Sequence, residues 1–219
     1  DCPSAQAFGY PLVELLFAAG PVFLDYADAD EPFDYFPARL SGSDALEVPL
    51  DDSRPARLVD LPRRQSGVLE EARADVTLGA DGRVDGSLSL TLRGPVAAMI
   101  RRVLRETASD QRPQIFRQMV SEVFPGATAG RTEIEGGSDP ETDLVLKIEL
   151  SGGSWGRRTP TGFAFPVVPH PLALFNEYAS LPTRNFGLLV DAQEFRRDVV
   201  SVRLPRGVTA GDVPSAVTL

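Results

Sequence analysis

Three side chains in the sequence belong to types that carry nucleophilic catalysis. Cys2 and His170 are the only cysteine and the only histidine. Ser154 lies in GGSWG (residues 152–156), which matches the G-x-S-x-G pattern of a nucleophile elbow. That elbow requires a helix directly after the serine, and the following residues, RRTP, are a poor helix start. We therefore expect a glycine-rich connection between strands at Ser154.

A cysteine and a histidine can act together as nucleophile and base. Here the charge of Asp1 disfavours a thiolate at Cys2, and His170 is flanked by two prolines. We interpret His170 as a surface or packing residue and predict that the chain does not catalyse acyl transfer. A single cysteine also excludes a disulfide within this chain and a cysteine-based metal site.

Acidic residues crowd into a short segment, residues 25–34. Hard cations such as calcium bind several carboxylate oxygens, although the EF-hand pattern is not matched because its glycine is missing. The segment is either a cation site or a solvated acidic loop, and we favour the loop. We expect no cofactor, since no dinucleotide, Walker or zinc pattern is present. The candidate cation ligands are Asp25, Asp28, Asp30 and Glu31.

The composition limits the classes of partner. The 219 residues include 22 basic and 31 acidic side chains, a net charge of −9. Such a surface repels phosphate, which argues against nucleic acid and against anionic membranes. No stretch reaches the roughly 20 apolar residues of a membrane helix, so we predict no membrane span. A protein partner, or another part of the same polypeptide, is the partner we expect.

The chain divides by composition into three parts. Residues 1–50 are apolar, aromatic and rich in turns, with two short strands joined at Gly20-Pro21. Residues 51–67 look like a linker, because charge, proline and glycine replace periodic apolar residues. Residues 68–219 are predicted to form a β-rich domain. It begins with a hairpin in which apolar alternation continues on both sides of GADG (residues 79–82).

Two helices are predicted near residues 95–106 and 112–124, because apolar residues recur there at i, i+3, i+4 and i+7. In the first helix this spacing indicates a buried face of Val96, Met99, Ile100 and Val103. Strand patterns surround the helices. We therefore predict a mainly β or α+β fold, an antiparallel, sandwich-like sheet with an inserted pair of helices and no βαβ alternation. The further strands are expected at residues 132–135, 144–150, 163–168, 186–190, 199–204 and 213–219.

Two segments near the start resemble a known family. FLDYAD (residues 23–28) followed by PFDYFPARLSG (residues 32–42) is similar to the end of the transglutaminase-like core in large bacterial envelope proteins. There the pattern reads approximately W-L-D-P-T, then P-F-G-x-L-P-x-x-L-x-G, and the core is flanked by domains of unknown function. PSAQAFGY (residues 3–10) is similar to the family's P-S-x-x-x-F-[ND]-H.

Later segments match the family more loosely but in order. They are Asp81-Gly82 with Gly86, the helix carrying Arg101-Arg102, FPGA (residues 124–127) and LPRG (residues 204–207). The resemblance implies that residues 1–50 are the end of a transglutaminase-like core. It also implies a periplasmic or envelope-associated protein.

The family's core implies a Cys-His-Asp site, in which the cysteine is the nucleophile, the histidine its base and the aspartate the residue that orients the histidine. By position, Asp25 corresponds to the aspartate, Tyr10 stands where the histidine is expected, and the cysteine would precede residue 1. A tyrosine with a pKa near 10 cannot replace a histidine base at neutral pH.

The reading we favour is a non-catalytic structural or interaction region of a larger, degenerate transglutaminase-like envelope protein. One alternative is an accessory domain of an active acyl-transfer or peptidase enzyme whose cysteine and histidine come from elsewhere. Another is a carbohydrate- or peptidoglycan-binding β-sandwich, for which Trp155, the only tryptophan, offers a sugar platform.

Overall fold

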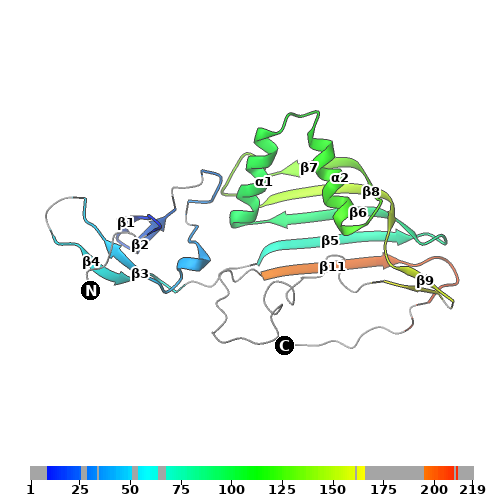
Figure 1. Ribbon diagram of the computed structural model, residues 1–219, viewed down its shortest axis with the longest axis horizontal. Helices are drawn as coiled ribbons and strands as arrows, with labels where there is room; N and C mark the ends of the chain where they lie inside the picture. Colours follow the sequence, from blue (N-terminus) through cyan, green and yellow to red (C-terminus); the bar gives the residue numbers. More distant parts are fainter. Residues whose placement is uncertain are drawn as a thin grey trace.

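The computed structural model describes residues 9–25, 29–33, 35–50, 54–63, 68–160, 162–165, 195–209 and 211. Two small hairpins form an N-terminal unit, and a five-stranded sheet with two helices forms the rest (Figure 1). The predicted mainly β or α+β class, with a pair of helices inserted into a mostly antiparallel sheet, is confirmed. Among the described residues, no helix has the length and apolar character needed to cross a membrane.

The N-terminal unit is built from two antiparallel hairpins. β1 (Val13–Phe17) pairs with β2 (Gly20–Leu24), so the two expected short strands are present, but the turn lies at residues 18–19 and Gly20-Pro21 begins β2 instead of joining the strands. Gly20 takes a φ of +123° directly after this turn. After a short 3₁₀ helix at Ala38–Leu40, β3 (Asp44–Glu47) pairs with β4 (Arg57–Asp60). β4 lies within residues 51–67, so this segment is not a linker without secondary structure.

The sheet of the second domain has the strand order β11-β5-β6-β8-β7. Three of its four pairings are antiparallel, and β11 pairs with β5 in parallel. The parallel pair was not expected from the sequence, because it joins strands far apart in the chain. The strands are β5 (Val68–Leu78), β6 (Arg83–Leu92), β7 (Thr128–Glu135), β8 (Leu144–Ser154) and β11 (Phe195–Arg203).

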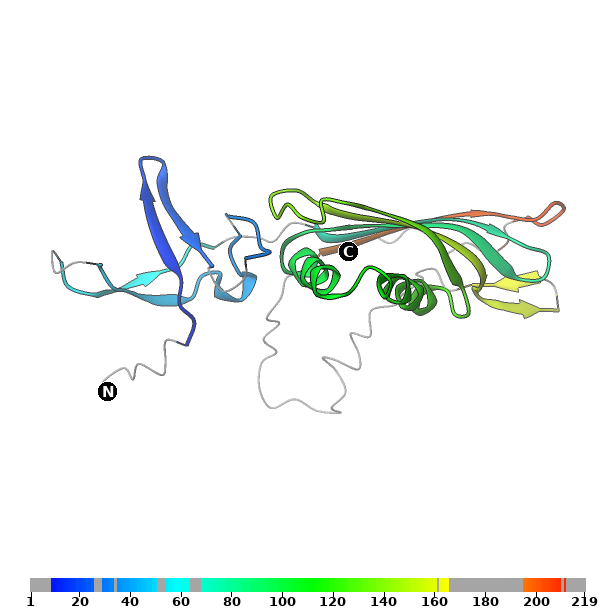
Figure 2. The ribbon, with the colours of Figure 1, turned by 90° about the horizontal axis from the view of Figure 1, so that it is seen from above.

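The helical pair connects β6 to β7. β8 lies between these two strands and is antiparallel to both, so β6 and β7 run in the same direction. No pattern in the sequence indicated this parallel connection. The helices α1 (Gly94–Glu106) and α2 (Arg112–Val123) match the predicted ranges closely and cover one face of the sheet (Figure 2).

The core lies between this sheet face and the helices. Alternate residues of the central strands are buried, including Val76, Leu88 and Ile148, as the alternation predicts. The predicted face of α1 is wrong in part, since Met99 is 55% exposed and Val103 37% exposed. The face that α1 buries consists of Gly94, Ala97, Ala98, Arg101 and Leu104. Its small residues allow the helix to approach the sheet closely.

A short hairpin follows β8. β9 (Arg157–Thr159) pairs with β10 (Gly162–Ala164), which covers the start of the strand expected at 163–168. The predicted strands at 132–135, 144–150 and 199–204 correspond to β7, β8 and most of β11. Those expected at 186–190 and 213–219 lie outside the described residues.

Candidate functional site

Tyr10 and Asp25 meet at one end of the first hairpin. In the β1–β2 pairing Val13 is opposite Leu24, so the chain before β1 and the chain after β2 lie side by side. The Tyr10 hydroxyl donates a hydrogen bond to Oδ2 of Asp25. Two positions that correspond to a catalytic histidine and aspartate should lie within side-chain reach, as Tyr10 and Asp25 do. The triad origin of Asp25 stays a prediction.

Arg39 and Tyr35 complete the surroundings of this pair. The Arg39 guanidinium carbon lies 4.2 Å from the centroid of the Tyr10 ring, a cation–π contact. Burial, followed by the hydrogen bond and the charge of Asp25, raises the pKa of Tyr10. Burial, followed by the charge of Glu31, raises the pKa of Tyr35 to about 12. Both phenols are therefore protonated at neutral pH.

The arrangement can hold a carboxylate and a ring in place, but the phenol of Tyr10 cannot serve as its general base. A base must be able to accept a proton near the working pH, which a phenol with a raised pKa cannot do. Cys2 and His170 lie outside the described residues, so the structure does not place them. Among the described residues, the hydroxyl of Tyr10 is a donor that lies next to Asp25.

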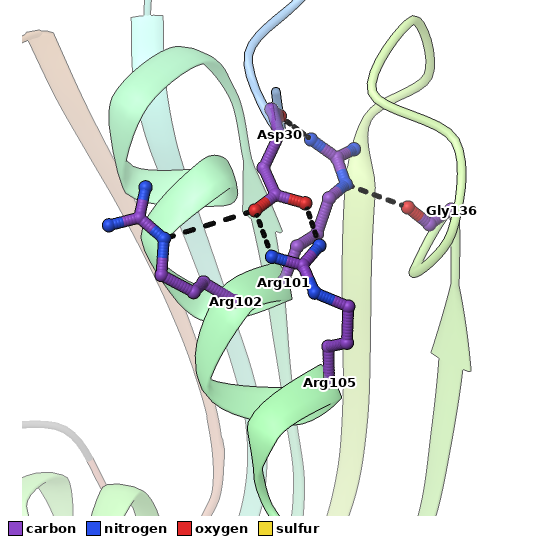
Figure 3. A network of polar contacts seen from close by, with 5 residues as sticks. All are labelled: Asp30, Arg101, Arg102, Arg105 and Gly136. Atoms are coloured by element: carbon purple, nitrogen blue, oxygen red, sulfur yellow. Dashed lines mark hydrogen bonds and ion pairs between the residues drawn. The ribbon is translucent and has the colours of Figure 1, made fainter. Parts of the chain in front are cut away.

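The acidic segment contains an ion-pair centre rather than an open carboxylate loop. Asp30 is 7% exposed and receives hydrogen bonds from both terminal nitrogens of Arg105, with 2.7 Å between Nη2 and Oδ2 (Figure 3). Nε of Arg102 lies 3.9 Å from Oδ2 of the same carboxylate. The Arg105 hydrogen bond holds the pKa of Asp30 below its usual range.

Two of the four candidate cation ligands, Asp25 and Asp30, bond to protein groups instead. Asp30 turns its carboxylate to arginines and Asp25 accepts the Tyr10 hydroxyl. Glu31 is half-buried, and Asp28 lies outside the described residues. Within the described ranges, no three histidine, cysteine, aspartate or glutamate side chains gather in a way that could hold a metal ion.

Arg101 is a buried residue whose role the sequence did not predict. It is 3% exposed, and its Nε donates to the carbonyl of Gly136 at 3.0 Å. Its Nη2 donates to the carbonyl of Thr142 at 2.5 Å, and its Nη1 to the carbonyl of Asp30 at 3.4 Å. The signal in the sequence is its position on the same helix face as Ala97 and Leu104.

Arg101 and Asp30 lie where the two parts of the molecule meet. Segment 29–33 contacts α1 through Asp30, and the backbone N–H of Phe33 donates to Oε1 of Glu141 at 2.8 Å. Glu141 belongs to the connection between β7 and β8. The N-terminal unit is thus joined to the sheet domain by polar contacts from residues more than 70 positions apart.

The GGSWG segment is not a nucleophile elbow. Ser154 ends β8, and the next element is the strand β9 instead of a helix. Trp155 is 5% exposed, stacked on Phe165 at 5.3 Å and edge-on to Phe124 at 5.8 Å. A Cβ at Gly153 would lie 2.9 Å from Cβ of Phe124, so this glycine permits close packing. Trp155 therefore does not offer an exposed platform to a sugar.

A small cavity lies away from the Tyr10–Asp25 contact, and a larger groove lies beside it. A cavity of about 190 Å³ opens between α2 and the β5–β11 pair. At its rim Arg196 pairs with Asp198 at 3.0 Å and lies 3.7 Å from Glu70. A groove of about 870 Å³ separates the two N-terminal hairpins and includes Tyr10 in its wall.

Comparison of the chain with protein-family models, with curated proteins and with solved structures found no match.

Proposed function

We propose that this chain is a non-catalytic structural and interaction region of a transglutaminase-like protein of the bacterial envelope. The observation that carries the proposal is the hydrogen bond from Tyr10 to Asp25. The resemblance puts a histidine–aspartate pair at these two positions. A protonated phenol there can orient the carboxylate, but it cannot activate a nucleophile.

The contacts between the two parts of the chain also support a structural role. The segment that contains Pro32 and Phe33 and the helix that contains Arg101 and Arg102 both belong to the stretches that resemble the family. In the fold they lie next to each other and are joined through Asp30, while Phe33 bonds to Glu141 in the connection between β7 and β8. The proposal treats the chain as one continuous region, and it therefore requires these two stretches to contact each other.

The accessory-domain alternative has no separate observation in its favour. It needs a catalytic cysteine and histidine from another molecule or segment, and the Tyr10 hydroxyl already occupies the carboxylate that would orient such a histidine. The carbohydrate-binding alternative is weakened because Trp155 is packed between Phe124 and Phe165.

The proposal is tested with the purified chain and three variants, Tyr10→Phe, Asp25→Asn and His170→Ala. We expect no turnover of acyl or amide substrates by any of the four proteins. We expect Cys2 to react with iodoacetamide at the rate of an ordinary exposed thiol. Turnover that disappears in Asp25→Asn would overturn the proposal, as would fast, saturable labelling of Cys2 that disappears in His170→Ala.

A structural role for the Tyr10–Asp25 contact has its own readout. Tyr10→Phe removes one hydrogen bond, so we expect the free energy of unfolding to fall by about 1 kcal/mol. Tyr35→Phe removes the hydroxyl of a half-buried tyrosine that forms no side-chain hydrogen bond with the described residues, and this matched control should keep the stability of the wild type. Equal stability of the Tyr10→Phe and wild-type proteins would show that the hydrogen bond does not support the fold.

A further inference from the structure

The groove between the N-terminal hairpins is bordered by two strand edges. β3 lines it with all four of its residues and β1 with Val13, Glu14 and Leu16, whereas β2 and β4 contribute only Phe23 and Val59. Consecutive residues of a strand point to opposite faces, so a groove lined by consecutive residues borders the edge of that strand. β1 and β3 each pair on one side only within the described residues. Their other edges present unpaired backbone N–H and C=O groups.

Apolar side chains are exposed along the same groove. Leu16 is 71% exposed, Val48 is 66% exposed and Leu50 is fully exposed, and all three line it. Single exposed apolar residues are ordinary, but a set gathered along one groove indicates a surface that another chain covers. A two-stranded hairpin is also only marginally stable in water by itself. Both hairpins would gain stability from an added strand.

The groove contains acidic side chains that have no basic partner among the described residues. Glu47 is paired with Arg54 and Arg57, but no described residue forms an ion pair or hydrogen bond with the side chains of Glu14 or Asp44. Asp44 is also directly opposite Asp60 in the β3–β4 pairing, and like charges in this position are destabilising. A positively charged group in the groove would relieve this repulsion.

We propose that this groove binds an extended segment of a partner protein in which apolar residues alternate with lysine or arginine, added as a strand along the edges of β1 and β3. The inference rests on the proposed function and names the chemistry of its partner. The open edges select an extended backbone, the exposed apolar residues select an alternating pattern, and Glu14 and Asp44 select the cations. The volume of about 870 Å³ lies in the range of roughly 300–1,000 Å³ that is common for ligand sites.

Two other occupants fit the groove less well. A lipid surface has no backbone to pair with the strand edges, and anionic headgroups would be repelled by a chain of net charge −9. A second copy of the chain carries the same −9 and would bring more negative charge to Glu14 and Asp44.

The test measures binding of a fluorescein-labelled peptide, Thr-Val-Lys-Val-Lys-Val-Thr, to the whole 219-residue chain by fluorescence anisotropy. We expect saturable binding with one peptide per chain. E14Q/D44N should weaken it at least tenfold. D75N/E149Q removes the same two charges from the exposed face of the five-stranded sheet and should leave affinity unchanged. Methylation of alternate peptide nitrogens should abolish binding, because strand pairing needs their N–H groups.

Several results would overturn the inference. They are the absence of saturable binding, equal affinity for a peptide with glutamate in place of lysine, or equal affinity of E14Q/D44N and wild type. Adsorption to phosphatidylcholine vesicles, or dimerisation of the chain, in place of peptide binding would assign the groove to a lipid surface or to a second copy. Circular dichroism of each variant excludes misfolding as the cause of a loss. If the peptide does not bind, the proposed non-catalytic function still stands. Acyl turnover would overturn that function but would not change the outcome of the peptide-binding measurement.

Discussion

Arg105, in the last turn of α1, forms a two-point ion pair with Asp30, which lies 75 residues earlier in the chain. Arg102 adds a weaker contact to the same carboxylate, and Arg101 donates to the backbone carbonyl of Asp30 (Figure 3). Three basic residues of one helix thus converge on one acidic residue of the N-terminal unit. This convergence makes Asp30 the residue whose loss should separate the two parts of the molecule.

Asp30→Asn should lower the free energy of unfolding by about 1–2 kcal/mol. The hydrogen bonds are charge-assisted, but Arg105 is 60% exposed and solvent screens the pair. Urea unfolding checks the size of the effect. Hydrogen exchange should become faster in segment 29–33 and in α1. Glu133→Gln, which removes one partner of the exposed pair between Arg131 and Glu133, is the control and should change stability by less than about 0.5 kcal/mol.

The ionisation of Asp30 should make the stability of the folded protein depend on pH. The folded pKa of Asp30 is lowered, chiefly by the hydrogen bond from Arg105, so the folded state favours the ionised carboxylate. Its contribution to stability is therefore fully present above the unfolded pKa of about 3.9 and is lost as the pH falls toward the folded pKa. Urea midpoints measured between pH 3 and pH 6, roughly the range around that unfolded value, should fall less steeply in acid for Asp30→Asn. Parallel curves for the two proteins would contradict this assignment.

Arg101→Met should destabilise the sheet domain by about 1–3 kcal/mol, because the carbonyls of Gly136 and Thr142 would lose their donor in a partly buried site. Arg101→Lys should restore only part of the loss, since an ammonium group cannot reproduce the planar fork of a guanidinium. Thermal unfolding measures both. Arg117→Met on α2 is the control, because Arg117 is exposed and makes a single 3.4 Å contact to the Pro113 carbonyl.

Gly86→Ala should cost about 3 kcal/mol or prevent folding. A Cβ at Gly86 would lie 2.1 Å from the carbonyl oxygen of Asp75 and 2.8 Å from Cα of Val76, and backbone atoms of the neighbouring strand cannot yield easily. Gly130→Ala is the matched variant in the same sheet, since its nearest neighbour would be Cβ of Glu149 at 3.4 Å. We expect it to fold with a stability close to that of the wild type. Comparable losses in both variants would show that the register irregularity at Gly86 is not tightly packed.

The single tryptophan offers a spectroscopic check of the β8–β10 region. Trp155 is buried between Phe124 and Phe165, so its emission should be blue-shifted in the folded protein and poorly quenched by iodide. Its Nε1 has no hydrogen-bond partner among the described residues, which is consistent with an apolar surrounding. Chito-oligosaccharides and soluble peptidoglycan fragments should leave the emission unchanged. A saturable change on adding them would revive a sugar-binding role.

The elements that depend on residues close in sequence were predictable. The alternation on both sides of GADG predicted the β5–β6 hairpin, and the apolar spacing predicted both helices close to their ends. These patterns reflect the periods of strands and helices, which each segment carries within itself. The same rule fails for β4, whose four residues are mostly exposed and become a strand only by pairing with β3.

The sequence by itself determined the fold class, the β5–β6 hairpin, the two helices and the pair of short strands, β1 and β2, that brings Tyr10 near Asp25. Only the tertiary structure decided that β11 joins β5 in parallel, that α1 buries Arg101 and exposes Met99, and that Asp30 faces arginines. A buried guanidinium is stable only where acceptors surround it, and here they are carbonyls from two distant segments, residues 30 and 136–142. Helical periodicity does not carry this information, because the acceptors that offset the cost of burial come from chain segments that meet only when the protein folds.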